Sequence, residues 1–514
     1  MLRRAFHKLQ DVRLAAAFVS VGLSLWCYAW DKVINVDGIL YVNAANKFSH
    51  GDWQGAMSIF NWPFYSWLIS LVSRLGLDPE IAAHCLNAFC LVTVVVAFIS
   101  IVKCLGGSRE VVFAAALLVL LYPLLNEYRS YVIRDHGFLA GYLLALLSFL
   151  KYCETKSWLW AAAWGTAMTL ATLFRIEGVF FLCLVPFVLF LAHDGNLRRR
   201  VAWFLKAHIV SIPIGLAVLG CWFLTTDSAG KNLLHQSQIR APVGYFEVLV
   251  NTFLVTLPEK AEVVSSILHD DASAYAISVV VAAVLMILCT ETLKTIGPFF
   301  GILTGHGIWL GELPSSKEKK RVLLAFITLN IAYLLAVTFL KFNLTGRSAV
   351  ALSLTLILWV PSSWVWLYKN WKAKRGSPLK RNWVFPAVCL GSLWFAGGGL
   401  ISIGPSKDFL REAGLWVKRN VPETDALFSN DTTVTYYAGR SKEELAMRLQ
   451  WDETVELLGA EPWKQYGCLA IRIRRKHPER TEEIQSLIRR APQKVFESWR
   501  GDRVLLFSVT AESR

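Results

Sequence analysis

Long apolar segments separated by short polar ones run through residues 12–400. A helix needs roughly 20 apolar residues to cross a bilayer, and by that measure the pattern predicts about eleven membrane-spanning helices. Their approximate ranges are 12–30, 80–103, 109–125, 137–153, 158–174, 179–192, 201–224, 274–293, 322–340, 348–368 and 383–400. The pattern therefore predicts a polytopic α-helical membrane protein.

After residue 403 the pattern becomes that of a soluble domain. Helical spacing of apolar residues in "SKDFLREAGLWVKRNV" predicts an amphipathic helix. Strands are expected at "DALFSND" and "GCLAIRIRR", helices at "KEELAMRLQ" and "RTEEIQSLIRR", and a hairpin around Gly501–Asp502. We expect a membrane domain over residues 1–403 and a small α/β domain over residues 404–514.

Composition supports the membrane assignment and charge orients the chain. The 514 residues are 55% hydrophobic and 18% charged, too apolar for an ordinary soluble enzyme. With the N-terminus inside, the dense basic clusters outside the tail all fall on the cytoplasmic side, as "NLRRR" and "KEKKR" illustrate. An odd number of spans then puts the C-terminus outside. The net charge of +15 is explained this way, and no nucleic-acid-binding motif accompanies it.

Cysteine spacing and the N-terminus add two exclusions. The ten cysteines lie mostly in apolar runs and form neither a disulfide framework nor a zinc motif, and Cys468 has no partner in the tail. The first apolar segment has a basic start but no small-x-small cleavage signal, so we interpret it as an uncleaved span.

Three segments between the spans are unusual. The first outer loop, residues 31–79, contains "GILYVNAANKF" and "NWPFYSWLISLVSRLG", which are typical of helices lying in the membrane interface. The outer loop 225–273 is long enough to be a functional lid. The Gly-rich segment "TIGPFFGILTGHGIWLGELP" is expected to be a cytoplasmic-side hairpin or interfacial stretch.

Charged residues on the predicted outer face are the candidates for chemistry. Asp37 follows the first span, where an ionisable group is costly unless it is used or solvated, although it could also cap the helix after it. Asp135 stands in "NEYRSYVIRDHGF" between Arg134 and His136, where an interfacial ion pair or another helix cap is the alternative. The two acids suit a general base with an orienting partner, or a divalent cation held by Asp37 and Asp135. No motif selects a particular metal.

Two further charged groups lie on the same face. Arg175 and Glu177 in "LFRIEGVFF" predict an ion pair at the headgroup region, either functional or structural. Lys341 and Arg347 in "KFNLTGRSAV" place two cations at an outer mouth, where they suit a lipid phosphate, with snorkelling as the alternative.

These motifs resemble one superfamily. Asp37-Gly38-x-x-Tyr41 followed by "HGDW" and "NWPFYSWLISLVSRLG" resembles the first outer loop of the membrane-embedded C-type glycosyltransferases, in particular the protein mannosyltransferase-like and aminoarabinose transferase-like branch. "YVIRDHGF" is similar to their second acidic site, "RIEG" to a turn between two spans, and "NLTGRSAVALSLTLILWVP" to the start of a late span. The tail with "FSNDTTVTYYAGR" is similar to that of bacterial and archaeal members.

The resemblance implies an enzyme that transfers a sugar from a polyprenyl-phosphate donor, with inversion at the anomeric carbon. The acceptor would be a lipid, glycan or protein of the cell envelope, at the periplasmic or extracellular face of a bacterial inner membrane. Asp37 would take the proton of the acceptor hydroxyl, Asp135 would assist it or share a cation, and Arg347 would hold the leaving phosphate. The other residues that the matching motifs or their charge assign to substrate binding are Tyr41, Arg134, His136, Arg175, Glu177 and Lys341.

The sequence departs from the family pattern at two positions. No second acid follows Asp37, which argues against a protein acceptor, and Ser348 stands where a tyrosine usually follows the late arginine. A transporter or flippase of lipid-linked or polar substrates is the main alternative, but the paired repeats and broken helices typical of that class are not evident in the sequence. A non-catalytic scaffold or polymer ligase, in which Asp37 would be dispensable, is a third possibility.

Overall fold

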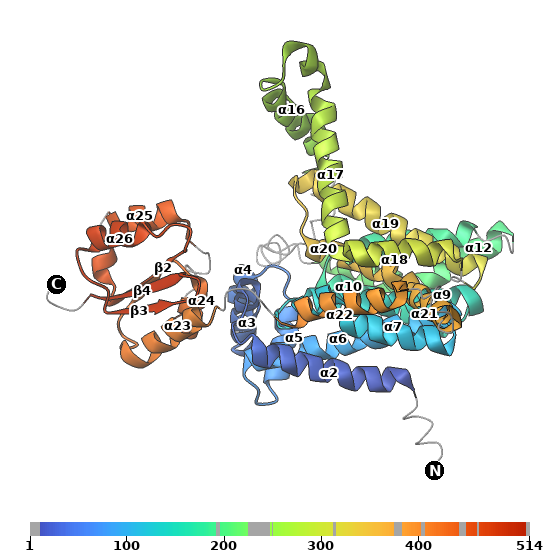
Figure 1. Cartoon of the computed structure of the whole chain (residues 1–514), viewed down its shortest axis with the longest axis horizontal. Helices are drawn as coiled ribbons and strands as arrows, with labels where there is room; N and C mark the ends of the chain where they lie inside the picture. Colours follow the sequence, from blue (N-terminus) through green and yellow to red (C-terminus); the bar gives the residue numbers. More distant parts are fainter. Residues whose placement is uncertain are drawn as a thin grey trace, which may run out of the picture. The chain divides into compact units, whose positions relative to one another are not determined.

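The computed structural model of the chain describes residues 11–191, 196–224, 247–248, 250–311, 315–374, 383–401, 407–440, 449–459 and 462–509 (Figure 1). The chain forms two compact units. Unit 1 comprises residues 1–24, 86–129 and 134–400, and unit 2 comprises residues 25–85, 130–133 and 401–514. The predicted boundary at residues 403 and 404 lies close to one break between the units, and the whole first outer loop, residues 31–79, belongs to unit 2.

Unit 1 consists of helices. They are the N-terminal part of α2 (Val12–Trp30), most of α6 (Pro79–Cys104), α7 (Arg109–Leu121), α8 (Pro123–Glu127), α9 (Asp135–Thr155), α10 (Trp158–Phe174), α11 (Gly178–Leu184), η1 (Val185–Leu191), α12 (Leu197–Ala207), α13 (Ser211–Leu224), η3 (Thr252–Thr256), α16 (Leu257–Ser265), η4 (Asp270–Tyr275), α17 (Ala276–Ile296), α18 (Pro298–Trp309), α19 (Lys317–Lys341), α20 (Gly346–Leu356), η5 (Ile357–Trp359), α21 (Val360–Lys374) and α22 (Val384–Leu400). Among the described residues, six helices are long and apolar enough to cross a membrane, or up to seven if a bent pair counts as one span. Helices occur at all eleven predicted positions, but their number as spans and their orientation stay predictions.

Contacts between helix ends define the two ends of unit 1. Lys319, near the start of α19, donates to the Cys104 carbonyl at the end of α6 (2.6 Å) and pairs with Glu154 near the end of α9 (2.5 Å). We call this the basic end. Because a helix rises 1.5 Å per residue, the first residue of α9, Asp135, lies ~30 Å along the axis from the last. We call that opposite end the carboxylate end.

The Gly-rich segment expected as a hairpin or interfacial stretch is instead a helix that joins the two ends. The Thr295 carbonyl at the end of α17 accepts a hydrogen bond from Tyr122 (2.7 Å), which follows α7 at the carboxylate end. Gly297, with a φ of +80°, then turns the chain into α18. After α18, the Ser315 N–H donates to the Leu105 carbonyl at the basic end (3.1 Å). The expectation was wrong because α18 has only 12 residues and contains several glycines, so it fell below the length criterion.

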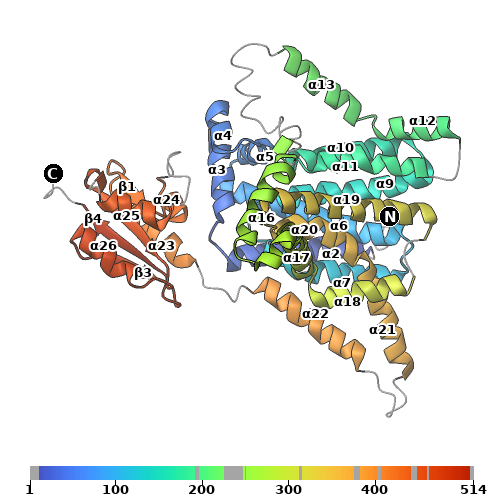
Figure 2. The same ribbon diagram turned by 90° about the horizontal axis from the view of Figure 1, so that it is seen from above.

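The predicted span 274–293 corresponds to α17, which lies across its neighbours. Figure 1 shows α17 upright while α18 and α7 run horizontally, and Figure 2 shows α17 end on while those two helices remain lengthwise. α17 is long and apolar enough to be a span, but α18 is the segment that runs between the basic end and the carboxylate end here.

The predicted span 201–224 is broken. Helices Leu197–Ala207 and Ser211–Ala217 are bent by 58° at the break after Ala207. Pro213 cannot donate a backbone hydrogen bond to the preceding turn, and this accounts for the interruption. The expectation of unbroken helices was therefore wrong at this position. The described part of the chain contains one broken helix of this kind. Transporters typically have two, in corresponding positions of two repeats.

Unit 2 contains the first outer loop and the C-terminal domain. Its loop helices are α3 (Val36–Ser49), α4 (Trp53–Ile59) and α5 (Phe64–Ser73). The expected helices at "GILYVNAANKF" and "NWPFYSWLISLVSRLG" are therefore confirmed as helices, and their interfacial placement stays a prediction. Most of the described part of loop 225–273 is helical, while residues 225–246 and 249 lie outside the described part.

The C-terminal domain has one sheet covered on both faces. Its elements are α23 (Asp408–Asn420), β1 (Leu427–Ser429), α24 (Thr432–Tyr437), α25 (Trp451–Gly459), η8 (Pro462–Gln465), β2 (Cys468–Ile473), α26 (Arg480–Ile488), β3 (Lys494–Glu497) and β4 (Arg503–Ser508). The strand order is β1-β2-β4-β3, with β1 parallel to β2 and the other pairs antiparallel. Alternate residues of the strands pack against α23 and α24 on one face and α25 and α26 on the other, as expected for a period of two (Figure 1). The predicted strands, the hairpin and the helices at 408–420 and 480–488 are confirmed, and most of "KEELAMRLQ" lies outside the described residues.

Candidate active site

Two arginines meet on one buried carboxylate at the carboxylate end of unit 1. Asp135, the first residue of α9, is 6% exposed. Its Oδ1 pairs with Nη1 of Arg175, from the turn between α10 and α11, and its Oδ2 accepts from Nη2 of Arg347 on α20 at 2.6 Å. The alternative that Asp135 caps α9 is wrong, because Arg134 is the N-cap residue and the Asp135 carboxylate faces the two guanidiniums.

Arg175 also makes the ion pair that the sequence predicted. Its Nη2 and Nε donate to Oε1 of Glu177 at 2.6 and 3.1 Å. Burial raises the pKa of Glu177, but the adjacent Arg175 charge and its hydrogen bonds outweigh burial and hold that pKa at about 2. The ion pair is therefore present, and its role in donor binding stays a prediction. We refer to Asp135, Arg175, Glu177 and Arg347 as the carboxylate–arginine cluster.

Two side chains that were not among the candidates support the cluster. The Tyr333 hydroxyl on α19 donates to Glu177 Oε1 at 2.7 Å. The guanidinium of Arg175 lies 5.6 Å from the centre of the Phe138 ring, within cation–π range. A tyrosine inside a predicted span and a phenylalanine one turn after an acid are ordinary features of membrane helices, so neither gave a usable signal.

A buried polar network fixes the three helices that carry these side chains. The Tyr142 hydroxyl on α9 lies 3.0 Å from the Thr355 hydroxyl on α20 and accepts from Asn330 Nδ2 on α19 at 2.7 Å. Satisfied polar groups between apolar helices specify one packing arrangement. Asp135, Tyr333 and Arg347 are thus presented by helices whose relative positions are locked a few turns away.

The other candidates near the cluster occupy different environments. His136 is 2% exposed, and its Nε2 donates to the Tyr128 carbonyl (2.9 Å), whereas its Nδ1 has no hydrogen-bond partner among the described residues. Arg134 is half-buried beside it. Lys341 is exposed at the end of α19 and makes no ion pair with any described carboxylate, so the structure does not bring it into the cluster.

Asp37 belongs to unit 2. It lies in the first turn of α3, whose N-cap is Asn35, so the alternative that Asp37 itself caps this helix is wrong. An acid in the first turn is nevertheless favoured by the helix dipole. The next residue is a glycine, because a Cβ at position 38 would lie 2.9 Å from the Val132 side chain. Asn35 holds Val132 close to this helix: its side-chain amide donates to the Val132 carbonyl and accepts from the Val132 N–H.

Tyr41 is 4% exposed and packs in unit 2 rather than lining a described pocket. Its ring meets those of Phe60 and Tyr65 edge to face at 4.9 and 5.1 Å between centroids. The same unit contains the tail segment singled out for its resemblance: "TTVTYY" forms α24, where the Tyr437 hydroxyl donates to the Lys32 carbonyl at 3.1 Å. Tyr41 and α24 therefore have clear packing roles.

Asp135 does not fit a divalent cation. Both of its oxygens are held by guanidiniums, and a metal there would lie against two positive charges. Within the described ranges no group of three or more His, Cys, Asp or Glu side chains could hold a metal. We assign no step to a metal ion.

Comparisons with known proteins agree with this fold. The family model described as dolichyl-phosphate-mannose-protein mannosyltransferase matches residues 61–222, a range that includes Asp135, Arg175 and Glu177. Archaeal oligosaccharyltransferase AglB from Archaeoglobus fulgidus, in complex with an inhibitory peptide and a dolichol-phosphate, is similar with a TM-score of 0.52 and 12% identity over 92% of this chain and 70% of that chain. ArnT from Cupriavidus metallidurans in the apo state is similar with a TM-score of 0.51 and 13% identity over 99% of both chains.

A third structure, the Archaeoglobus fulgidus oligosaccharyltransferase tethered with an acceptor peptide, has a TM-score of 0.49 and 12% identity, and the alignment covers 80% of this chain and 57% of that one. No curated protein matches the sequence. At these identities the AglB and ArnT structures, with TM-scores above 0.5, show a common fold. The family model over residues 61–222 and these two structures agree with the resemblance of the chain to membrane-embedded C-type glycosyltransferases.

Proposed function

We propose that the protein transfers a sugar from a polyprenyl-phosphate donor to a hydroxyl of a cell-envelope lipid, glycan or protein. The acceptor oxygen would form a bond to the anomeric carbon from the side opposite the phosphate, the bond from that carbon to the phosphate oxygen would break, and polyprenyl phosphate would leave. The acceptor proton would pass to a base. The observation that carries the proposal is the meeting of Arg175 and Arg347 on the buried Asp135 carboxylate.

A departing phosphate needs positive charge that is already in place. Preorganised donors in a dry site stabilise developing negative charge without reorganisation, and removal of one such donor typically costs about 10²–10³-fold in turnover. A guanidinium presents five N–H donors, and each arginine pairs with Asp135 through one of its terminal nitrogens. Arg347 is the more accessible of the two, with its side chain 30% exposed against 13% for Arg175, so we assign the first contact with the donor phosphate to Arg347.

The lipid nature of the donor is supported by the placement of the cluster. It lies at one end of helices that are long and apolar enough to cross a membrane, where a headgroup and a hydrocarbon tail can be bound at the same time. The related AglB structure holds a dolichol-phosphate, as its description states. We place this end on the periplasmic or extracellular side of a bacterial inner membrane, because the opposite end carries the basic clusters.

The role of each acid follows from its environment. Asp135 is a positioning residue in this proposal, since a carboxylate that accepts from two arginines is a weak base. We keep Asp37 as the proposed general base on the strength of the family motif.

Purified protein in nanodiscs, mixed with a panel of polyprenyl-phosphate sugars, tests the proposal when products are followed by mass spectrometry. We expect release of polyprenyl phosphate with one of these donors, and loss of that release in Arg347→Ala. Lys320→Ala is the matched control, because Lys320 is an exposed cation at the basic end. Release that persists in Arg347→Ala, or that is lost equally in the control, would contradict the assignment.

A further inference from the structure

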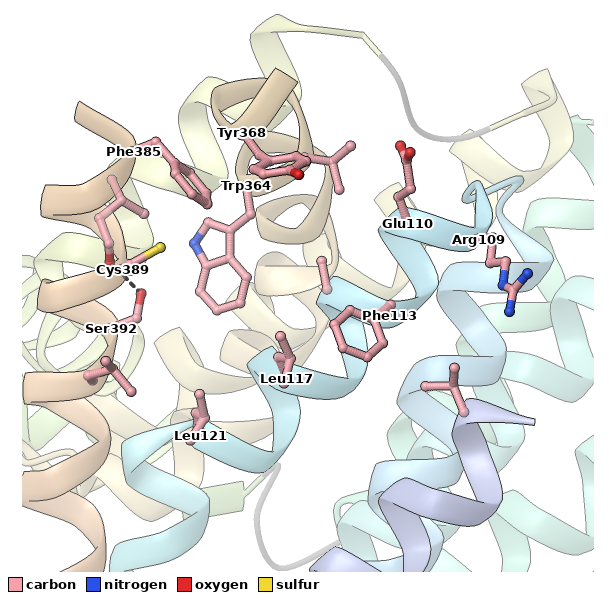
Figure 3. Close-up of a pocket in the computed structure, with 15 residues that line it drawn as sticks. Arg109, Glu110, Phe113, Leu117, Leu121, Trp364, Tyr368, Phe385, Cys389 and Ser392 are labelled. Atoms are coloured by element: carbon pink, nitrogen blue, oxygen red, sulfur yellow. Dashed lines mark hydrogen bonds between the residues drawn. The ribbon is translucent and has the colours of Figure 1, made fainter. Parts of the chain in front are cut away.

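A cavity of unit 1 lies away from the carboxylate–arginine cluster. Its volume is about 820 Å³, and its walls come from α7, α21 and α22 with the first residue of α2 (Figure 3). Most of its lining is apolar, including Phe113, Leu117 and Leu121 on α7. This groove begins at Arg109 and reaches Leu121, which is ~18 Å at 1.5 Å per residue. One leaflet contributes about half of a ~30 Å hydrocarbon core, so the groove has the depth of a single leaflet.

Charge is confined to one end of the groove. Arg109 and Glu110 lie together at that end (Figure 3), and Glu110 pairs with Lys369 on α21 at 2.8 Å. Arg109 and Lys369 against Glu110 leave a formal excess of one positive charge at this end, which we call the mouth of the groove. This mouth follows the turn after α6, so it is at the basic end of unit 1.

An unused hydrogen-bond donor is buried beside the groove. The indole nitrogen of Trp364 on α21 has no hydrogen-bond partner among the described residues, although the atom is buried. Figure 3 shows this nitrogen turned toward Cys389 and Ser392 across the groove. The Ser392 hydroxyl already donates to the Val388 carbonyl of its own helix. A buried N–H without a partner is costly, and a ligand with an oxygen at this depth would satisfy it.

We propose that this groove binds an anionic glycerophospholipid of the leaflet at the basic end. One acyl chain lies along α7 between α21 and α22, the phosphate sits at Arg109, and an ester carbonyl accepts from Trp364 Nε1. Basic pockets between membrane helices recognise anionic headgroups by the same combination of charge and depth. This lipid is distinct from the proposed donor, whose phosphate is assigned to the opposite end of the helices, so the site is independent of the proposed function.

The groove has features that favour a lipid over a second copy of the chain. Its apolar walls are interrupted by a single buried donor, and its charge sits at the depth of a headgroup. A helix from another copy would bring no free backbone acceptor for Trp364, because its carbonyls are already bonded within the helix.

Native mass spectrometry of the full-length protein, released from nanodiscs of equal phosphatidylglycerol and phosphatidylcholine with matched chains, tests the proposal. We expect one retained phosphatidylglycerol, at roughly tenfold excess over phosphatidylcholine. Both lipids carry the phosphate, but the choline cation of phosphatidylcholine would be repelled by Arg109 and Lys369, and an unfavourable charge contact of this kind is of that order. Arg109→Gln should remove the preference for phosphatidylglycerol. Leu117→Trp, which fills the groove from a side chain that is 41% exposed, should lower retention of both lipids.

The controls separate a specific site from general attraction of lipids to basic protein. Lys320→Gln removes an exposed cation at the same end without touching the groove, and it should retain phosphatidylglycerol as wild type does. Trp364→Phe keeps the ring and removes the N–H, so it should shorten retention without changing the headgroup preference. Equal retention of both lipids by wild type, or an equal effect of Lys320→Gln and Arg109→Gln, would overturn the proposal. A monodisperse elution profile for each variant excludes misfolding as the cause.

Discussion

Replacing Asp135 with asparagine tests whether this carboxylate holds the two arginines in place. The substitution removes the negative charge between Arg175 and Arg347 and leaves the shape of the side chain nearly unchanged. Removal of one partner of a buried ion pair typically costs about 3–5 kcal/mol, because an uncompensated charge remains. Arg175 keeps Glu177 as a partner, and Arg347 is 30% exposed and partly screened. We therefore take the lower limit, about 3 kcal/mol of stability.

The expected effect on turnover is larger than that on stability. Once Asp135 is neutral, the two guanidiniums repel each other and no longer converge on one point. A displacement of about 1 Å in a positioning group can cost about 100-fold in rate. We expect Asp135→Asn to unfold at a lower temperature and to lose about this much turnover, with weaker binding of polyprenyl phosphate.

Thermal unfolding in detergent and a donor-binding titration measure these two effects separately. Asp431→Asn is the matched control, because Asp431 is 3% exposed and pairs with Arg472 at 2.6 Å in the C-terminal domain. The control should destabilise that domain and leave donor affinity unchanged. Full donor affinity and wild-type turnover in Asp135→Asn would refute the reasoning.

Four further outcomes are expected. Asp37→Asn should abolish transfer while expression and membrane insertion stay normal, and wild-type turnover would remove Asp37 as the base. Arg347→Ala should weaken polyprenyl-phosphate binding by about 10–100-fold, the cost of a hydrogen bond to a charged group, in a direct binding titration; unchanged donor affinity would contradict its role. Tyr333→Phe should reduce turnover by only about fivefold, since Glu177 keeps both of its hydrogen bonds from Arg175, and a loss as large as in Arg347→Ala would mean that Tyr333 does more than orient Glu177. Burial raises the pKa of Cys468 to about 11, so this thiol should resist maleimide at neutral pH until the domain unfolds, and peptide mapping that finds it labelled in folded protein would contradict this.

The sequence predicted the parts of the cluster that are close along the chain. Arg175 and Glu177 are two residues apart in a turn between apolar helices, and their ion pair is local. Asp135 and Arg347 are 212 residues apart, and nothing in the pattern of either segment specifies that they touch. Such a contact depends on the packing of α9 against α20, which periodicity does not encode. For the same reason the sequence suggested Lys341 and Arg347 as a pair, while only Arg347 reaches the carboxylate.

Length and composition also explain the errors in the fold. A threshold of about 20 apolar residues identifies regular spans, but it overlooks α18, which has only 12 residues. The opposite error occurs at α17, which satisfies the threshold and yet lies across its neighbours. In the soluble domain, where strands alternate and a hairpin turn contains Gly501, local signals were sufficient for the elements that the structure describes.

The charge balance of the cluster suggests how a donor would enter it. Two arginines and two carboxylates give no formal net charge, so the cluster is stable without a ligand even where it is buried. An arriving phosphate can pair with an arginine by sharing it with Asp135, because a guanidinium has five N–H donors and the carboxylate can still hold it in position. This sharing costs less at Arg347, whose side chain is more exposed, than at Arg175, which Asp135 and Glu177 hold from two sides. Arg175 then acts as the fixed anchor and Arg347 as the side chain that also contacts the phosphate, so Arg347→Lys should keep part of the donor affinity, whereas Arg175→Lys should disturb the fold of the cluster itself.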